Sequence, residues 1–532
     1  MKPTVAVLKD FKGLNLQHSS ELEDSELVDA QNVVISNQGT IVKRPGCKMV
    51  GGLLVGGGSF PILNYYNQSN SSSLVFVSEG FGGTGIKTFY KNAGVYVAGP
   101  SSSLSATAET AVQYDNKVYI YSTSQDPVAY TSTGATTGTF AAVTSPAGYS
   151  VRATHAITHR FRVFYFNNAD SSESSRLRWT NLYAVGVTFG DTAAYSALNY
   201  IDIGAGDGDF LVSVIELSGF LLVFKRFSTW IVNTDGLSSS WSARKVHDSV
   251  GCTGRDTPFL IENMVYFLAA DGVYRTDGTT FQHISDDVDN AMVVPNATFT
   301  YDVCNRASAV RWKDWYIIRK TYEFDKLAFV YGWKTKTWTL WNLPVKTGPL
   351  VVGTGTGPAG GAAYPSGVGG GGGSLSSAAA VELTAIDYEY YGSGLNNSIH
   401  EISQLYFSDD VFVGSKGSGS WVDSDIAIQL ETKFFDFGYP FDWKRLHYVT
   451  LDTDESSNNT SNRTVTVTFN RNGLTSSSSL TQSDYRRAQW RFRGPGLLRY
   501  VSLKINAASK YPFQINAIGL ALSSDGEVGK SV

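Results

Sequence analysis

A short strand-like pattern recurs along this 532-residue chain and limits its possible folds more than any other feature. Each copy has an apolar residue, a turn, and then a run rich in Val, Ile, Leu, Tyr and Phe. The copies are centred on Phe76, Tyr119, Phe164, Leu222, Tyr266 and Tyr316, which are 43, 45, 58, 44 and 50 residues apart. An interval of about 40 to 50 residues fits one four-stranded blade of a β-propeller. The pattern therefore predicts six or seven blades, and a non-repetitive β protein stays open as the alternative.

The composition also favours strands joined by tight turns. The sequence contains 29 Tyr, 29 Phe and 53 Gly, and these residue types are common in strands and in turns. Only 17% of the residues are charged, so disorder is not expected for most of the chain. All-β is therefore the predicted fold class.

Three parts are expected along the chain. Residues 1–60 are predicted to form an N-terminal arm with a hairpin, and residues 61–410 the propeller. Residues 420–525 contain six long alternating segments, which predict a separate antiparallel sandwich or barrel. Residues 352–377 are rich in Gly and Ser and predict a surface loop. No Gly-Lys-Ser/Thr follows these glycines, which argues against a phosphate-binding loop.

The N-terminal arm is predicted to start with a helical turn. Ser25 is in position to cap a short helix that carries Leu27 and Ala30 on one side. The arm has no core of its own, so the propeller is expected to fold when residues 1–46 are deleted.

A basic hairpin is predicted to follow this turn. Two β-branched runs, 33–35 and 41–42, flank the turn residues Asn37-Gln38-Gly39. Lys43 and Arg44 then form a basic pair that is expected to be exposed.

Charge, cysteine content and hydropathy exclude several classes of protein. The net charge of −4 does not suggest a protein that wraps nucleic acid. Cys47, Cys252 and Cys304 are widely spaced and lack a zinc or disulfide pattern, so buried free thiols are expected. The N-terminus has no apolar signal-peptide region and the apolar runs are strand-sized, so neither secretion nor a membrane span is predicted.

The sequence contains no recognisable catalytic or metal-binding pattern. His155 and His159 lie in a strand-like segment and need not share a face. The acidic run 202–209 is interpreted as a Gly-Asp loop, with a calcium site as the alternative. Neither a Gly-x-Ser-x-Gly elbow nor the Ser-x-Asp-x-Gly-x-x-Trp turn typical of sialidase propellers is present. We therefore predict no catalytic, cofactor-binding or metal-binding residues, no cofactor and no enzymatic activity.

One stretch of concentrated positive charge lies near the C-terminus. Residues 485–504 contain no Asp or Glu but carry the cations Arg486, Arg487, Arg491, Arg493, Arg499 and Lys504. Strand alternation places Arg491 and Arg493 on one face, and Trp490 and Phe492 on the other. A solvated face, a protein interface and a DNA contact all stay open as interpretations.

Several short motifs resemble those of tail proteins of tailed bacteriophages. They are Gly13-Leu14-Asn15, the acidic stretch 21–32, the Gln38-Gly39 turn between two strands, the closing Lys43–Gly46, and the Trp-Arg-x-Arg-Gly motif at 490–494. The whole chain is similar to the nozzle or hub proteins of short-tailed phages, also called tail tubular or packaged-DNA stabilisation proteins.

The resemblance implies a structural virion protein made in the bacterial cytoplasm. Six copies would form a ring that extends the head-to-tail channel below the portal and adaptor. This ring would retain packaged DNA, let it pass during ejection, and dock tail fibres, spikes or needle proteins. It implies no membrane anchoring by this chain. A glycan-binding or glycan-cleaving propeller at the host surface, and a scaffold for protein interactions in a bacterial cell, stay open as alternatives.

Overall fold

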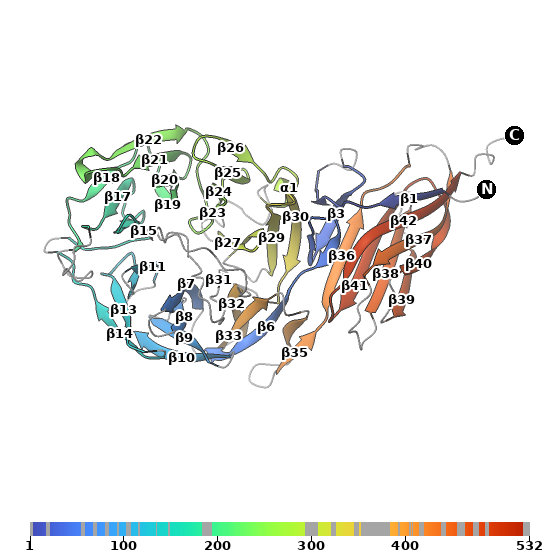
Figure 1. Ribbon diagram of the computed structural model, residues 1–532, viewed down its shortest axis with the longest axis horizontal. Helices are drawn as coiled ribbons and strands as arrows, with labels where there is room; N and C mark the ends of the chain where they lie inside the picture. The colour runs from blue at the N-terminus through green and yellow to red at the C-terminus, as the bar shows by residue number, and fades with distance from the viewer. Residues whose placement is uncertain are drawn as a thin grey trace.

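The regular secondary structure of the described residues is almost entirely β-strand, as the sequence predicts (Figure 1). One α-helix, α1 (Asp289–Met292), and a short 3-10 turn at Ser238–Ser240 interrupt the strands in the described part of the chain. The computed structural model describes residues 4–17, 22–54, 59–67, 72–79, 85–92, 95–102, 108–114, 117–134, 136–146, 149–182, 194–292, 307–320, 326–344, 351–352, 383–391, 394–403, 406, 408–413, 420–437, 443–454, 463–471, 478–484 and 489–524. The predicted loop at 352–377 and Cys304 fall outside these ranges, apart from residue 352.

Four-stranded antiparallel units follow one another along the chain. The first three are β7 (Ser59–Asn67), β8 (Ser72–Glu79), β9 (Ile86–Asn92), β10 (Val95–Ser102); β11 (Thr110–Tyr114), β12 (Lys117–Tyr121), β13 (Val128–Ser132), β14 (Gly138–Ala142); and β15 (His155–His159), β16 (Arg162–Phe166), β17 (Arg176–Trp179), β18 (Tyr200–Asp202). The next three are β19 (Leu211–Leu217), β20 (Phe220–Lys225), β21 (Thr229–Asn233), β22 (Ser242–His247); β23 (Phe259–Ile261), β24 (Met264–Leu268), β25 (Val273–Thr276), β26 (Phe281–His283); and β27 (Ala307–Trp312), β28 (Trp315–Lys320), β29 (Leu327–Gly332), β30 (Thr337–Asn342).

A seventh unit combines the two halves of the chain. Its strands β31 (Val351–Val352), β32 (Leu383–Tyr391) and β33 (Gly394–Ser403) pair in sequence order, and β6 (Gly46–Leu54) from the N-terminal region adds the outermost strand. The described residues therefore contain seven units, and an early strand completes the last of them.

The units surround a common centre (Figure 1). The first strand of each unit contacts the first strand of the next, from β7 through β31, and β31 contacts β7 again. We call this arrangement the sheet ring. The six repeat anchors predicted from the sequence, from Phe76 to Tyr316, lie on the second strand of successive units.

Two-residue turns explain why the repeat is visible in the sequence. The hairpin between first and second strands has positive φ at both central residues in Arg160-Phe161, Ser218-Gly219 and Glu262-Asn263. Such turns match the right-handed twist of the strands they join. In these three units the turn therefore has the same length, and an apolar strand follows it at the same position.

A second body, which we call the sandwich, packs beside the sheet ring. One sheet contains β4 (Val33–Ile35), β5 (Ile41–Lys43), β42 (Gln514–Ser524), β37 (Lys444–Thr453) and β40 (Gln489–Leu498), with β1 (Thr4–Leu8) paired to β42. The other contains β3 (Glu26–Gln31), β36 (Ile426–Thr432), β41 (Val501–Ser509), β38 (Arg463–Arg471) and β39 (Ser478–Asp484), with β2 (Gly13–Leu14) paired to β3. A two-stranded sheet, β34 (Asp409–Val413) with β35 (Ser420–Ser424), lies near the junction.

The sandwich shares its core with the sheet ring. Trp490 and Phe492 of one sheet and Ile505 of the other are fully buried in an apolar cluster that continues into Tyr316 and Trp338 of the sixth unit. The strand β3 also pairs in parallel with β30, so one sheet runs from the sixth unit into the sandwich. The six C-terminal strands predicted from the sequence are present, with β39 in addition, but their core is not separate from that of the ring.

The N-terminal segment is not a free arm. β1 pairs with β42, β3 with β36, and β5 with β42, so the first 43 residues supply strands to both sheets of the sandwich. The predicted hairpin at 33–43 is confirmed, whereas the predicted helical turn is wrong because residues 26–31 form β3. Pairing with β36 and burial of Leu27 and Ala30 against the core outweigh the weak local preference for a helix.

The basic pair of the hairpin is buried, which corrects the expectation of an exposed site. Arg44 is 1% exposed and forms a bidentate ion pair with Asp409 at 2.5 and 3.0 Å. Its other N–H groups donate to Asn32 Oδ1 at 2.8 Å, Pro45 O at 2.8 Å and Asn342 O at 2.8 Å. The Lys43 ammonium is also buried and donates to Ser509 O at 2.7 Å. Both cations hold the N-terminal segment to the rest of the protein.

We expect Arg44→Met to destabilise the protein by about 3–5 kcal/mol, because the substitution leaves the Asp409 carboxylate buried without its partner. Urea unfolding followed by tryptophan fluorescence measures this loss. Arg491→Met, at an exposed arginine, is the matched control and should cost about 0.5 kcal/mol or less. Equal losses in the two variants would contradict the assignment of Arg44 as a buried tie.

Candidate functional site: the arginine face of the sandwich

The exposed part of the basic stripe lies on the outer side of one sandwich sheet. Along β40 the burial alternates, with Trp490 and Phe492 inside and Arg491 and Arg493 outside. The inward residues pack opposite Leu451 and Val449 of β37, so the core fixes which residues face outward. This agrees with the alternation predicted from the sequence.

Residues that are paired across four strands, β1, β42, β37 and β40, lie in two rows, and each row ends at one arginine. One row contains Val7, Gly519, Thr450 and Arg491, and the other contains Val5, Ala521, Tyr448 and Arg493. Val5 and Val7 are 48% and 55% exposed. We call this surface the arginine face; it combines cations at one edge and exposed valines at the other, with Gly519, Ala521, Thr450 and Tyr448 between them.

Aromatic rings support two of the arginines. The Arg491 guanidinium carbon lies 3.7 Å from the centre of the Tyr448 ring, and that of Arg499 lies 4.8 Å from the Trp443 ring at the end of the same sheet. Within the described residues, neither Arg491 nor Arg493 forms an ion pair with a carboxylate. The charges of these two arginines are therefore available to a partner.

Lys504, another residue of the predicted stripe, is not part of this face. Lys504 lies on β41 in the opposite sheet, beside Glu431 of β36. Arg486 and Arg487 lie outside the described residues. Sequence proximity therefore overstated the stripe, because β40 and β41 belong to different sheets.

A group of carboxylates that the sequence analysis did not single out gathers around α1. Glu26, Asp271, Asp286, Asp287 and Asp289 come from β3, the β24–β25 turn and the segment after β26; we call them the acidic cluster. Burial, followed by the charge of Glu26, raises the pKa of Asp287. The run Asp286-Asp287 was visible in the sequence, but the contributions of Glu26 and Asp271 depend on the fold.

Part of this cluster has the residue types of a cation site. Among the described residues, His283, Asp286 and Asp289 can each offer one ligand atom within 4.8 Å of the others. His283 Nδ1 lies 2.5 Å from Asp286 and Nε2 lies 3.3 Å from Asp289. Each of these two carboxylates therefore already contacts the imidazole. The Ser285 hydroxyl donates to Asp289 at 2.5 Å. The cluster is therefore held together by its own hydrogen bonds.

An ion pair crosses the centre of the sheet ring. Arg255, which precedes β23 of the fifth unit, donates to Glu109 Oε2 of the second unit at 2.8 Å and to Thr154 O at 3.1 Å. The fifth and second units are not neighbours in the ring, so this contact spans its middle. His155, at the start of β15, is 9% exposed and contacts Val214 O through Nε2 at 3.2 Å.

Burial lowers the pKa of His155 to about 4, with Asp256 partly opposing the shift and Arg255 adding to it. An unfolded histidine has a pKa of about 6.5, so protons bind the unfolded state first as the pH falls. The contribution to stability is complete above about pH 6.5 and is lost as the pH falls towards about 4.

We expect the stability lost between pH 7.5 and pH 5 to be about 2 kcal/mol smaller in His155→Gln than in the unmodified protein. Glutamine keeps an N–H donor for Val214 O but does not titrate. Urea unfolding at the two pH values measures the difference, with His247→Gln on β22 as the control. An unchanged pH dependence in His155→Gln would rule out this role of the buried imidazole.

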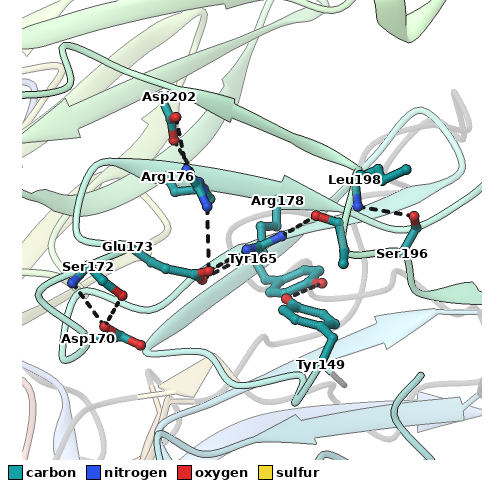
Figure 2. Close-up of polar contacts among 11 residues, drawn as sticks. Tyr149, Tyr165, Asp170, Ser172, Glu173, Arg176, Arg178, Ser196, Leu198 and Asp202 are labelled. Atoms are coloured by element: carbon teal, nitrogen blue, oxygen red, sulfur yellow. Dashed lines mark hydrogen bonds and ion pairs between the residues drawn. The ribbon is translucent and has the colours of Figure 1, made fainter. Parts of the chain in front are cut away.

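A network of arginine, tyrosine and carboxylate lies in the third unit (Figure 2). Arg176 binds Asp202 in a bidentate pair at 2.7 and 3.0 Å. Arg178 donates to both carboxylate oxygens of Glu173, and to Ala197 O at 3.0 Å. These are residue types that a sialidase-type site would use, but each charge here is matched by another.

The tyrosines of this network are not set up as nucleophiles. The Tyr149 and Tyr165 hydroxyls lie 3.0 Å apart, and Figure 2 shows them facing each other. Burial raises the pKa of Tyr165 well above its ordinary value, so its phenol stays protonated near neutral pH. Tyr165 stacks on Tyr121 of the second unit, which identifies the cluster as packing between units.

The acidic loop at 202–209 is used within the protein. Asp207 pairs with the buried Lys225 ammonium at 2.6 Å, and Asp202 pairs with Arg176. Asp209 accepts backbone N–H groups of Arg226 and Phe227 at 3.0 and 3.1 Å. The interpretation as a Gly-Asp loop therefore fits the contacts better than a calcium site.

An open cleft of about 490 Å³ lies between the β4–β5 turn and the β29–β30 turn. Its lining includes Lys12 and Lys334 beside Ser36, Asn37 and Thr335. The two ammonium groups are paired with Glu23 at 2.6 Å and Asp314 at 2.8 Å, so the cleft does not offer unpaired charge to an anion. Cys47 and Cys252 are buried and form no disulfide, as the sequence predicts.

Comparison with known proteins gave limited results. No protein-family model matches the sequence, and a search of curated proteins returned no match. The BBS1N chain from a crystal structure with ARL6DN aligns with 67% of this chain and 96% of its own length at 10% identity and a TM-score of 0.38. The extracellular domain of the putative one component system BT4673 from B. thetaiotaomicron aligns with 95% of this chain at 10% identity and a TM-score of 0.40. This chain covers 63% of that second protein, and similarity at this level carries no functional argument.

No helix in the described residues has the length and hydrophobicity needed to span a bilayer.

Proposed function

We propose that this chain is a structural subunit of a short phage tail. Six copies form a nozzle or hub ring in the virion, extend the head-to-tail channel, retain packaged DNA until ejection, and dock fibres, spikes or needle proteins. The observation that carries the proposal is the arginine face, whose exposed Arg491 and Arg493 have no carboxylate partner within the described residues. The resemblance of the N-terminal motifs to phage tail proteins supports the same assignment.

The sheet ring is proposed to be a seven-bladed β-propeller. The cyclic contacts of its first strands and the completion of the seventh unit by β6 support this proposal. Closure of a ring by an early strand ties its ends together, so the body acts as a rigid block. A rigid block with exposed loops at its ends is suited to lateral packing around an axis.

The DNA path is proposed to lie between copies rather than through one sheet ring. The Arg255–Glu109 contact crosses the centre of the ring, and a DNA duplex is far wider than the gap that such a contact leaves. A conduit for DNA therefore needs several copies around a common axis. The near-neutral charge of the chain suits a channel that must release DNA.

A catalytic role is not proposed. The residues of the third unit that resemble a glycosidase set are internally paired, and Tyr165 is buried with a raised pKa. That network is nevertheless the specific observation that keeps a glycan-binding or glycan-cleaving propeller as the second candidate. The portal and adaptor, which would lie above the ring of six copies, are proposed as partners from the resemblance alone.

We expect the purified chain to form homohexamers at micromolar concentrations, because the arginine face then meets a partner surface. Native mass spectrometry measures the number of copies, and negative-stain microscopy shows whether they form a ring. The proposal would be contradicted if the protein stays monomeric up to about 100 μM and never enters a ring, either alone or with tail proteins. Binding or turnover of host surface polysaccharide by the monomer would support the second candidate instead.

A further inference from the structure

The arginine face has the chemistry of a protein interface. It presents Arg491 and Arg493 next to Tyr448, and arginine and tyrosine are enriched where protein surfaces meet. Val5 and Val7 add exposed apolar area at the other edge of the face. A surface built to hold DNA phosphates would gain little from these valines.

The edge strand next to this face is also open. β1 pairs with β42 on one side, and no strand in the described residues pairs with its other side. Exposed strand edges present unpaired N–H and C=O groups that a neighbouring chain can satisfy. The sheet therefore offers backbone groups as well as side chains to a partner.

Like charge prevents the face from binding a second copy of itself. A two-fold contact would place Arg491 and Arg493 of one copy against those of the other, and such pairs repel. The partner surface must carry negative charge. A contact between unlike surfaces also leaves each copy with one surface free for the next, so it produces rings or filaments.

The acidic cluster supplies the complementary charge on the same chain. Asp286 is 68% exposed and Asp271 is exposed. Burial raises the pKa of Asp287 and of Asp289, and the charge of the neighbouring Asp286 adds to both shifts. The His283 imidazole contacts Asp286 and Asp289 directly. An approaching pair of arginines would relieve the repulsion among these carboxylates.

The two surfaces lie on different parts of one copy. α1 is on the sheet ring beside β30, whereas β40 is on the side of the sandwich away from the ring (Figure 1). The arginine face of one copy therefore reaches the acidic cluster of another copy and not its own.

We propose that the arginine face of each copy docks on the acidic cluster of the next copy, which makes this the contact that propagates around the assembly. This inference rests on the proposed self-assembly. It adds to that proposal which two surfaces meet, and that successive copies are arranged head to tail.

Charge reversal on each side tests the contact. Variant one carries Arg491→Glu and Arg493→Glu, and variant two carries Asp271→Lys and Asp286→Lys, all at exposed positions. Each variant alone should assemble at least about tenfold more weakly than the unmodified protein, because like charges then meet at the contact. Circular dichroism should show that both variants stay folded. Arg244→Glu with Lys245→Glu on β22, also exposed, is the matched control and should assemble normally.

Mixing the two variants gives the decisive measurement. In an alternating assembly, the glutamates of variant one meet the lysines of variant two, and the arginines of variant two meet the native acidic cluster of variant one. We expect an equimolar mixture to recover assemblies of the unmodified mass, measured by mass photometry. High salt should weaken both the native and the mixed assemblies, since exposed charges are screened.

Three outcomes separate the possibilities. Normal assembly of either variant alone overturns this contact but leaves the proposed function intact. Failure of the unmodified protein to assemble under any condition overturns the proposed function itself. Loss of binding to a duplex DNA probe in variant one, with assembly unchanged, would identify the face as a DNA surface and overturn the contact.

Discussion

The buried ion pair between Arg44 and Asp409 is the interaction on which the rest of the structure depends. It lies where the N-terminal strands, the last strand of the sixth unit and the start of β34 meet. A guanidinium removed from water is tolerated only when its donors are matched, and here Asn32, Pro45 and Asn342 complete the set. This requirement fixes the position of β6, which begins two residues later and closes the seventh unit. The contacts of Arg44 consequently join the sheet ring and the sandwich into one folded unit.

This construction explains why the useful surfaces lie outside the ring. The centre is crossed by Arg255, and the arginines of the network in the third unit are paired with carboxylates. Among the described residues, Arg491 and Arg493 on the sandwich have no carboxylate partner, and several carboxylates gather around α1. A rigid body with a cationic face and an acidic cluster is suited to hold neighbours at a fixed angle. The proposed role as a tail ring needs that property more than it needs a pocket.

Much of the fold was predictable because it depends on local patterns. The six anchors all fall on second strands, and in the third, fourth and fifth units a two-residue turn of the same backbone geometry precedes the anchor strand. The alternation of Trp490 and Arg491 predicted the two faces of β40, because successive side chains of a strand point to opposite faces. The helical turn at 25–30 was mispredicted because Leu27 and Ala30 satisfy a helix as well as a strand, and only pairing with β36 decides between them. The acidic cluster was missed because Glu26 and Asp271 are far from Asp286 in the sequence.

The sequence by itself determined the strand content, the repeat interval and which side chains of each strand are apolar, because these follow from residue types at short spacing. Only the tertiary structure decided where the ends of the chain go. Lys43 and Arg44 have the appearance of surface cations in any local reading, yet they are buried because their partners, Ser509 and Asp409, lie hundreds of residues away. Pairing over such distances depends on the whole fold, since no local signal specifies which carboxylate or carbonyl a buried cation will meet.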